Sequence, residues 1–418
     1  MKIRFKDVLY IKGRIGWQAL KKNEYLPSGD YYLITGVDIK DNHLIDFSNC
    51  YYVSKERYEM DEKIQVHDGD IIVTKDGTIG KIGYIDKLDK PATLNSHLFL
   101  IRNTRKDILD SKYLFYLLQS DMFKKYAINN TSGSNIPAFT QKNIEEFEYD
   151  LPPLERQSKI ANCISLLDSK INTNIMINDN LQQQINDIYS MWFNQFEFPN
   201  DINKPYKTSG GRLIYNQILK QNIPERWNVA SIANNPLCSF IDVGLNNFSI
   251  KNYLATANVN GTTIIDGDNI TFENRESRAN MQPALNTVWF AKMKNSIKHI
   301  FISSKASWMI DKYIFSTGFS GLHCDDQSFS FIASTIMQPY FEATKDVLSH
   351  GATQEGVNND DLDSIPLLIP SKEVLDKYTR LVKCHFEKMN SLMLETQKLS
   401  NLRDELLPLL MNGQVSIV

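Results

Sequence analysis

The sequence has few cysteines, no long hydrophobic run and no excess of charge of either sign. Its five cysteines, Cys50, Cys163, Cys238, Cys324 and Cys384, lie at least 60 positions apart, which excludes a disulfide framework or a CxxC metal knuckle. No stretch approaches the roughly 18 apolar residues of a membrane span, and the first residues lack a signal peptide's apolar core, so we expect a cytoplasmic protein. Lys and Arg number 46 against 49 Asp and Glu, and this net charge of -3 excludes DNA binding by bulk charge alone.

The rest of the composition is that of a globular protein with more than one domain. The chain has 418 residues, 42% of them hydrophobic, whereas single domains usually have about 100 to 200 residues. From 1 to 150, runs such as YYLITGV at 31 to 37 and DIIVT at 70 to 74 predict strands. The stretch KYLFYLLQSDMFKKYA at 112 to 127 predicts one helix among them. We therefore expect an α+β fold.

A long helix is predicted to follow Pro152 and Pro153, because the next 40 residues contain neither Gly nor Pro. Residues 202 to 368 then return to strand-like runs, among them NTVWFA at 286 to 291 and SFSFIA at 328 to 333. A second proline-led boundary, with Ser371 as a helix cap, begins a second long helix. We expect that helix to end or kink near Leu407, ahead of Pro408.

The second half of the chain repeats the first. An offset of 218 residues maps Pro152 onto Pro370 and Asn172 onto Asn390 without a gap. The same offset carries the apolar positions of the first long helix onto mostly apolar positions of the second. We interpret the chain as a duplicated unit, in which each copy is an α+β domain followed by a long helix.

Two long helices with apolar seams are expected to bury those seams against each other as an antiparallel coiled coil, which would give the chain a pseudo-two-fold repeat. Asn174 and Asn178 interrupt the first seam, where they either set the register or mark solvated gaps, and His385 and Arg403 interrupt the second. The predicted apolar seam consists of Ile160, Ile164, Leu167, Ile171, Leu181, Ile185, Ile188, Val382, Met389, Leu392, Leu399 and Leu406.

No catalytic constellation stands out in the sequence. The one dense group of possible metal ligands, HCDD at 323 to 326, is interpreted as a loop because no further ligands stand out elsewhere. The run DGTIGK at 76 to 81 has two residues between its glycines where a nucleotide-binding P-loop has four, so it favours a hairpin with a basic tip that could contact DNA phosphates. Leu151 and Leu154 flank a Pro-Pro pair where an amino-methyltransferase carries a polar residue and an aromatic ring. We expect no metal and no cofactor in this chain.

The helical regions resemble those of a known family. The run LPPLERQSKIANCISLLDSKI at 151 to 171 and the ending LRDELLPLLMNGQV at 402 to 415 look like the conserved helical regions of the specificity (S) subunit of type I restriction-modification systems. This resemblance implies two target recognition domains, at 1 to 150 and 199 to 368, each reading one half of a bipartite, asymmetric DNA site. It also implies that the helical regions at 151 to 198 and 369 to 418 are spacers that fix the gap between the halves.

The resemblance implies partners as well. In that family the S subunit carries no chemistry and docks two adenine-N6 methyltransferase (M) subunits, which use S-adenosylmethionine. Two restriction (R) subunits that depend on ATP and magnesium can join them. We therefore expect a non-catalytic DNA-recognition subunit. Two alternatives remain open, namely a methyltransferase- or nuclease-associated chain with catalytic function of its own and a coiled-coil adaptor without DNA function.

Charge and loop position indicate which residues would contact double-stranded DNA. They are Lys21, Lys22, Lys75, Thr78, Lys81, Ser134, Asn135 and Gln141 in the first domain, and Lys292, Lys294, Asn295, Lys298, Thr353 and Gln354 in the second. Because lysine mostly positions the DNA backbone, we expect Asn135 and Gln141 to contribute more to specificity. Basic and acidic residues number 22 and 22 in 1 to 150, and 14 and 16 in 201 to 370. We therefore expect weak DNA binding by the chain alone, with partner subunits supplying much of the electrostatic attraction.

Overall fold

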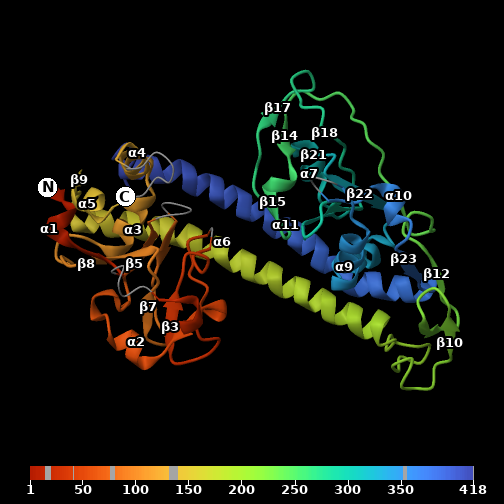
Figure 1. Cartoon of the computed structure of the whole chain (residues 1–418). Coiled ribbons are helices and arrows are strands. Elements are labelled where there is room, and N and C mark those ends of the chain that lie inside the picture. Colours follow the sequence, from red (N-terminus) through yellow and green to blue (C-terminus); the bar gives the residue numbers. More distant parts are fainter. Residues whose placement is uncertain (15–19, 41, 76–80, 131–139, 352–354, 418) are drawn as a thin grey trace. The chain divides into compact units, whose positions relative to one another are not determined.

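The computed structural model describes residues 1–14, 20–40, 42–75, 81–130, 140–351 and 355–417 (Figure 1). The chain forms two compact units: unit 1 comprises Met1–Asn172 and Lys398–Val418, and unit 2 comprises Thr173–Gln397. Both units combine sheets and helices, which confirms the α+β prediction. Two long helices, α6 (Leu154–Tyr189) and α11 (Lys372–Met411), belong to both units: each helix has one segment in unit 1 and one in unit 2. None of the described helices is long and apolar enough to span a membrane.

Unit 1 is built on a four-stranded antiparallel sheet, β2-β8-β5-β6, and a three-stranded sheet, β4-β3-β7, in which β3 and β7 are parallel. Its strands are β1 (Lys2–Arg4), β2 (Leu9–Gly13), β3 (Tyr31–Ile34), β4 (Tyr51–Val53), β5 (Ile71–Thr74), β6 (Ile82–Tyr84), β7 (Ala92–Leu94), β8 (Leu98–Asn103) and β9 (Glu148–Asp150). Its helices, besides the long ones, are α1 (Phe5–Val8), η2 (Lys22–Glu24), η3 (Phe47–Asn49), α2 (Lys55–Glu59), η4 (Glu62–Ile64), α3 (Ser111–Gln119), α4 (Asp121–Asn129) and α5 (Gln141–Glu145). β1 pairs with β9 and so joins the two ends of the domain.

The single helix expected at 112 to 127 is in fact two helices, α3 and α4. The break lies at Ser120, whose backbone is extended and whose Oγ accepts a hydrogen bond from the backbone N of Phe123, 3.3 Å away. Serine in this position is a good helix N-cap, and here it ends one helix and starts the next. The apolar periodicity runs through both helices, so it did not reveal the break.

Unit 2 contains two four-stranded sheets, β13-β22-β19-β20 and β17-β14-β21-β18, and β14 and β21 are parallel. Its strands are β10 (Leu213–Asn216), β11 (Gln221–Pro224), β12 (Asn228–Ser231), β13 (Cys238–Phe240), β14 (Lys251–Leu254), β15 (Val259–Asn260), β16 (Thr263–Ile264), β17 (Asn269–Ile270), β18 (Ala279–Met281), β19 (Thr287–Ala291), β20 (His299–Ile302), β21 (Tyr313–Ser316), β22 (Phe319–Cys324) and β23 (Pro366–Ile369). Its shorter helices are η5 (Ser190–Asn194), η6 (Thr256–Asn258), α7 (Ser307–Lys312), α8 (Phe329–Ile336), α9 (Pro339–Leu348) and α10 (Asn359–Leu362).

The strand expected from SFSFIA at 328 to 333 is wrong, because this segment begins helix α8. Seven of its eight residues are buried, so the helix is apolar on nearly every side. A short run without a polar face has the same pattern in a buried helix and in a buried strand, and its aromatic residues favoured the strand.

The predicted repeat is confirmed by the order of the elements. α8, α9, α10, β23 and α11 each begin 218 residues after α3, α4, α5, β9 and α6. The sheets correspond as well, since β8-β5-β6 has its counterpart in β22-β19-β20 and the parallel pair β3-β7 in β14-β21. Each unit is therefore one copy of the same α+β domain.

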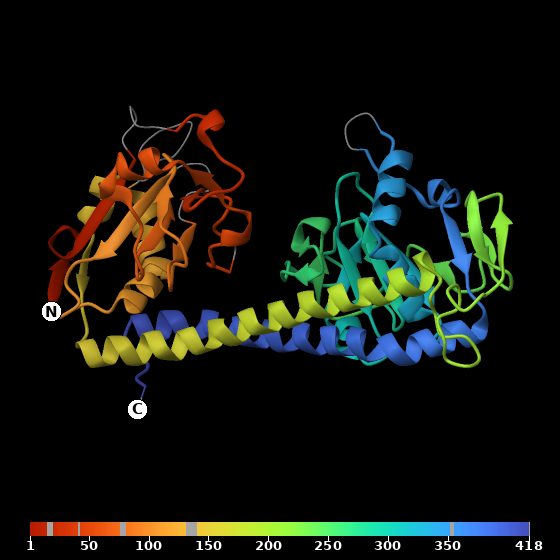
Figure 2. The ribbon, with the colours of Figure 1, turned by 90° about the horizontal axis from the view of Figure 1, so that it is seen from below.

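The long helices run antiparallel to each other within each unit (Figure 2). In unit 2, Asn174 Nδ2 on α6 donates to Glu395 Oε2 on α11 at 3.0 Å, and ten residues further along α6, Gln184 Oε1 lies 3.2 Å from His385 Nε2. As the residue number rises on one helix it falls on the other. Asn174 is buried, and its contact with α11 favours a role in setting the register.

All twelve residues of the predicted apolar seam are buried or half-buried. In unit 2, Ile185 and Val382 are among those that belong to the same hydrophobic cluster as the sheet and α8. In unit 1, Ile160 and Ile164 lie in one cluster with α3 and the larger sheet. The helix segments therefore complete the hydrophobic core of the domain in each unit.

Of the end or kink expected near Leu407, the end is wrong, because helix α11 continues past Pro408 to Met411. A proline inside a helix removes the hydrogen bond to the carbonyl four residues earlier. Here that carbonyl belongs to Asp404, which is exposed and can be hydrated. One lost bond in the last turn is not enough to end the helix.

Candidate nucleic-acid interface

The hairpin predicted at 76 to 81 and the candidates at 292 to 298 lie at equivalent points of the repeat. One connects β5 with β6 in unit 1, and the other connects β19 with β20 in unit 2. Lys75 and Lys81 flank the first connection, whereas 292 to 298 form the second. Thr78 lies outside the described residues. Hairpin tips at the edge of a rigid sheet are exposed, and therefore suited to recognition.

In unit 1, the described candidates belong to different parts of the domain. Lys75 is half-buried, with its Nζ 5.4 Å from the centre of the Phe99 ring, and the backbone N of Lys81 donates to Thr74 Oγ1 at 3.0 Å. Lys21 and Lys22 are exposed at η2, in the segment that leads to the smaller sheet.

Gln141 opens helix α5, and its amide donates to Glu145 Oε1 at 2.6 Å. This bond lies within one helix and leaves the side chain half-buried. Ser134 and Asn135 lie outside the described residues.

In unit 2, the structure brings the candidates together at one hairpin tip. Lys294 forms an ion pair with Glu355, with 2.5 Å between Nζ and Oε2, and a β-bridge joins Met293 to Gly356. The tip of 292 to 298 therefore lies beside Glu355 and Gly356. The candidates Thr353 and Gln354 lie outside the described residues.

The lysines of this tip are engaged within the chain. Lys298 Nζ donates to the carbonyl oxygen of Thr256 at 2.6 Å, and burial lowers the pKa of Lys292. Asn295 is exposed, with its backbone in the left-handed region at a φ of 55° and its N donating to Asp346 Oδ1 at 3.0 Å. Asn295 therefore presents the more available polar side chain.

A buried ionic cluster below this tip was missed by sequence reasoning. His299 Nε2 lies 2.7 Å from Glu342 Oε1, and Lys345 Nζ lies 2.6 Å from Glu342 Oε2. Burial acts to raise the pKa of Glu342, but hydrogen bonds from His299 and Lys345 outweigh it and hold this pKa below its usual value. The one signal in the sequence is the Glu-Lys pair spaced three residues apart on α9, which is ordinarily a solvent-exposed pair.

The HCDD segment has no metal-site geometry. Cys324 ends strand β22 opposite Cys238 of β13, and burial raises the pKa of its thiol. Asp326 pairs with Lys383 of α11, with 2.6 Å between Nζ and the carboxylate. No group of three or more metal-ligating side chains occurs in the part of the chain that the structure describes.

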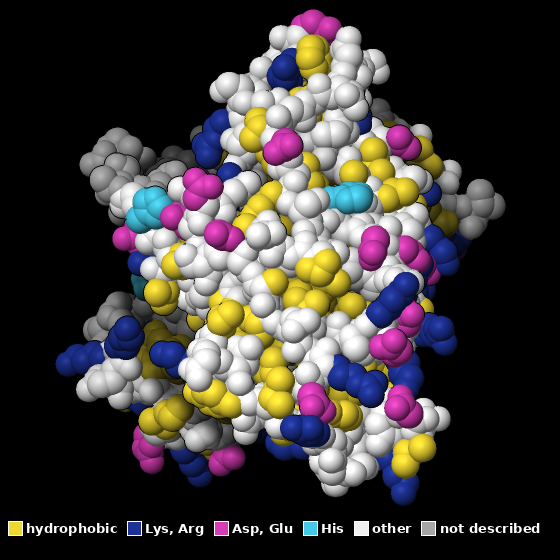
Figure 3. Space-filling view, turned by 90° about the vertical axis from the view of Figure 1, so that its right-hand side faces the viewer, with side chains coloured by type: hydrophobic (Ala, Val, Ile, Leu, Met, Phe, Trp, Pro, Cys, Tyr) yellow, Lys and Arg dark blue, Asp and Glu magenta, His cyan; other side chains and the backbone are white. Residues whose placement is uncertain are grey.

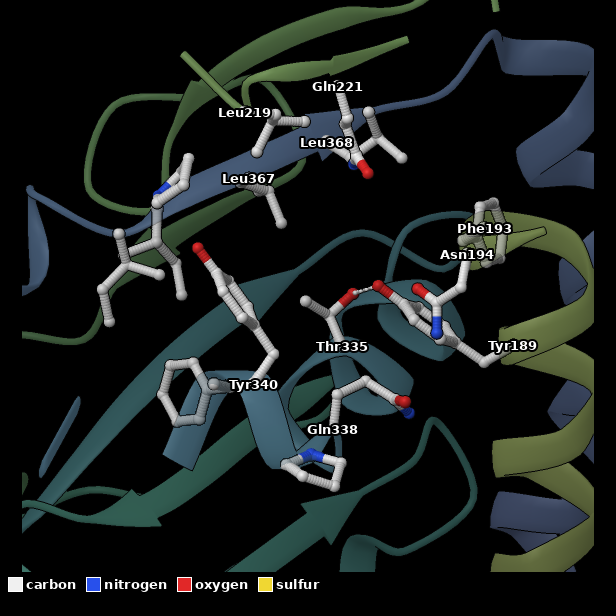
Figure 4. A pocket seen from close by; sticks show the side chains of 15 residues that line it. Tyr189, Phe193, Asn194, Leu219, Gln221, Thr335, Gln338, Tyr340, Leu367 and Leu368 are labelled. Carbon is white, nitrogen blue, oxygen red and sulfur yellow. Dashed lines mark hydrogen bonds between the residues drawn. The ribbon is translucent and has the colours of Figure 1, made fainter. Parts of the chain in front are cut away.

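A hollow of about 490 Å³ in unit 2 is lined mainly by apolar side chains (Figure 4). Tyr189 lines it from the end of α6, Phe193 from η5, Tyr340 from α9, and Leu367 from β23. Thr335 Oγ1 donates to Tyr189 OH at 3.3 Å inside it. Its lining contains no charged residue, and its titratable side chains are Tyr189 and Tyr340.

Charges of both signs are mixed on one face of the molecule. On the face drawn in Figure 3, Lys and Arg side chains lie interspersed with Asp and Glu, and hydrophobic side chains lie between them. This agrees with the balanced charge of the whole sequence. A surface of this kind does not attract nucleic acid over a long range.

Two copies of one α+β domain, each with a hairpin at the same point of the sheet and each continued by a long helix, define the class of this protein as a chain with a duplicated domain. The family model described as type I restriction modification DNA specificity domain matches residues 1–186. Over these residues the chain carries the specificity domain of type I restriction-modification systems, and specificity subunits of such systems are similar to it over nearly its whole length.

Relatives similar over nearly the whole chain include two specificity subunits. The MjaIX specificity subunit of Methanocaldococcus jannaschii is 24% identical over 99% of this chain and 93% of its own length. The HindI specificity subunit of Haemophilus influenzae is 23% identical over 97% of this chain and 99% of its own. The crystal structure of a type I S subunit from M. genitalium covers 98% of this chain and 95% of its own, with a TM-score of 0.54 at 15% identity, and shows that the fold is shared.

Proposed function

We propose that this chain, as a specificity subunit whose role is DNA sequence recognition, reads a bipartite site with one of its repeated domains on each half. The observation that carries this proposal is the 218-residue repeat of α3, α4, α5, β9 and α6 in α8, α9, α10, β23 and α11. A duplicated domain provides two surfaces with the same fold, and each can recognise DNA. The residues at their tips differ, so the two halves of the site differ in sequence.

The long helices are proposed to fix the gap between the two halves and to dock the M subunits. Each helix contributes a segment to the core of both units, so the helices link the two domains through a continuous backbone. A helix rises 1.5 Å per residue, and its length therefore sets a defined spacing. Exposed apolar side chains on the outer surface of the helices, such as Leu166, Met176 and Leu402, are available for protein contacts.

The chain is proposed to be a non-catalytic member of its enzyme. The two M subunits would bring S-adenosylmethionine for adenine-N6 methylation, and R subunits would bring ATP and magnesium. The balanced surface charge supports a division of labour, in which this chain reads the bases and its partners provide much of the attraction to phosphates.

The test is long-read sequencing of host DNA with the gene present and deleted. We expect a bipartite methyladenine motif that disappears on deletion. A chain with its own catalysis would methylate DNA as a purified protein with S-adenosylmethionine and without partners. A reconstituted assembly that fails to distinguish DNA sequences would favour the adaptor alternative.

A further inference from the structure

The β19–β20 tip of unit 2 is held on a buried cation. Lys345 of α9 is fully buried, and its ammonium donates to the carbonyl oxygens of Ala291, at 3.2 Å, and of Ser296, at 3.1 Å. These two carbonyls enclose the turn formed by 292 to 295. Glu342 Oε2 lies 2.6 Å from the same ammonium as an ion pair, so the charge has an acidic partner as well as two carbonyl acceptors. A buried lysine is rare because it must be paired to offset the loss of hydration.

The same cluster holds the other arm of the hairpin. His299, the first residue of β20, contacts Glu342 Oε1 through Nε2 at 2.7 Å. The neighbouring Asp346 accepts the backbone N of Asn295 at 3.0 Å. Helix α9 therefore contacts the hairpin at the end of β19, at the turn and at the start of β20.

Along the tip, exposed side chains alternate with side chains that bond to other parts of the chain. Met293, Asn295 and Ile297 are exposed, whereas Lys294 and Lys298 bond within the chain. Of the three exposed residues, Asn295 carries the donor-acceptor amide that can read a base edge with paired hydrogen bonds. Its direction depends on the backbone of the turn, which Lys345 holds.

We propose that Lys345 is a positioning residue for DNA recognition by unit 2, because it fixes the turn that presents Asn295. This inference rests on the proposed function. Recognition groups held in place before binding discriminate better than groups that must be ordered on binding. At the equivalent positions of the repeat, unit 1 has Ala127 in place of Lys345 and Lys124 in place of Glu342. The contacts that Lys345 and Glu342 make with the hairpin therefore occur in one domain only, and their loss should affect one half of the DNA site.

The test is motif mapping with variants of the full chain, co-expressed with its methyltransferase subunits in a host analysed by long-read sequencing. Lys345→Met removes the ammonium but leaves Glu342 buried without its cation, which can impair folding. The double variant Lys345→Met/Glu342→Gln avoids that charge imbalance and still lacks the donors to the turn. Lys383→Met is the matched control, because its ammonium pairs with Asp326 at the surface of the same unit.

In the double variant, the preference for the correct base over a mismatch should fall about ten-fold or more in one half of the motif. It should be the half that changes when 202 to 368 are exchanged, and the other half and the control should stay as in the wild type. An unchanged motif would overturn the inference, as would equal relaxation of both halves or loss of assembly. A wild-type chain without any bipartite motif would refute the proposed function itself, and the inference with it.

Discussion

Asn390 and Asn172 occupy the same position of the repeat but have different surroundings. Asn390 on α11 is buried, its Oδ1 accepts from the backbone N of Ser303 at 3.0 Å, and its Nδ2 donates to the carbonyl of Phe301 at 2.6 Å. It thus pairs backbone groups beside β20, the edge strand of its sheet. Asn172 on α6 is half-buried and accepts one bond, from the Asn42 amide at 3.0 Å.

Asn390→Ala should lower the free energy of unfolding by roughly 2 to 4 kcal/mol, because it leaves two buried backbone groups unpaired. Asn172→Ala, the matched variant, should cost less than about 1 kcal/mol. Chemical unfolding of the two variants and the wild type measures the difference. Equal losses would show that the bonds of Asn390 contribute no more than a surface contact.

Glu148 makes part of the stability of the β1–β9 pairing depend on pH. Lys2 Nζ lies 2.7 Å from its carboxylate and Arg4 also pairs with it. Hydrogen bonds from Lys2 and Arg4, with their positive charges, lower the pKa of Glu148 to about 2 from 4.5. A carboxyl whose pKa is lowered by folding stabilises the folded state at every pH above its pKa in the unfolded chain. This contribution is lost as the pH falls from about 4.5 toward 2.

Glu148→Gln should therefore reduce the loss of stability between pH 4.5 and 2. The difference should be small, since the three side chains are exposed and their pairing is screened by solvent. Melting temperatures measured across this range provide the comparison. Parallel acid slopes for the variant and the wild type would contradict the expectation.

At the scale of elements, the long helices are the parts for which sequence and structure agree best. Their lengths, proline-led starts and antiparallel pairing follow from a periodic pattern without Gly or Pro and from the repeat. The split of α3 from α4 at Ser120, the helical form of α8 and the course of α11 through Pro408 did not follow. In each case the local pattern allowed two outcomes, and packing or hydration selected one.

Lengthening both long helices should widen the gap in the recognised DNA site. Four residues inserted in α6 after Asn172 and four in α11 after Gln397 add slightly more than one turn, or about 6 Å, to each helix while keeping their side-chain pairing in step. At 3.4 Å per base pair, the gap should grow by one or two base pairs. Methylation motifs of the insertion variant would show this directly. An unchanged gap would show that the helices do not set the spacing.

At the scale of the whole molecule, the repeat makes the two recognition domains independent modules. Unit 1 and unit 2 have separate hydrophobic clusters, and each has its own sheets and hairpin. The side chains that would read DNA therefore belong to one domain at a time. A change in one domain should not reach the bases read by the other.

Exchange of 202 to 368 for the matching domain of another family member should change one half of the DNA motif and leave the other intact. Motif mapping of the chimaera against both parents is the measurement. Exchange of 1 to 150 is the reciprocal control and should change the opposite half. If either chimaera alters both halves, recognition is not modular.

The sequence by itself determined the α+β class, the 218-residue repeat and the two long helices, because periodicity, proline boundaries and offset are properties of the chain that need no tertiary contact. It also predicted the hairpin between β5 and β6 and selected the polar residues of 292 to 298. Only the tertiary structure showed that Lys294 and Lys298 bond within the chain and that the turn of Asn295 rests on Lys345. The sequence does not show whether a charged side chain on a loop faces solvent or bonds to a neighbouring carbonyl. The packing of the folded chain decides which of the two occurs.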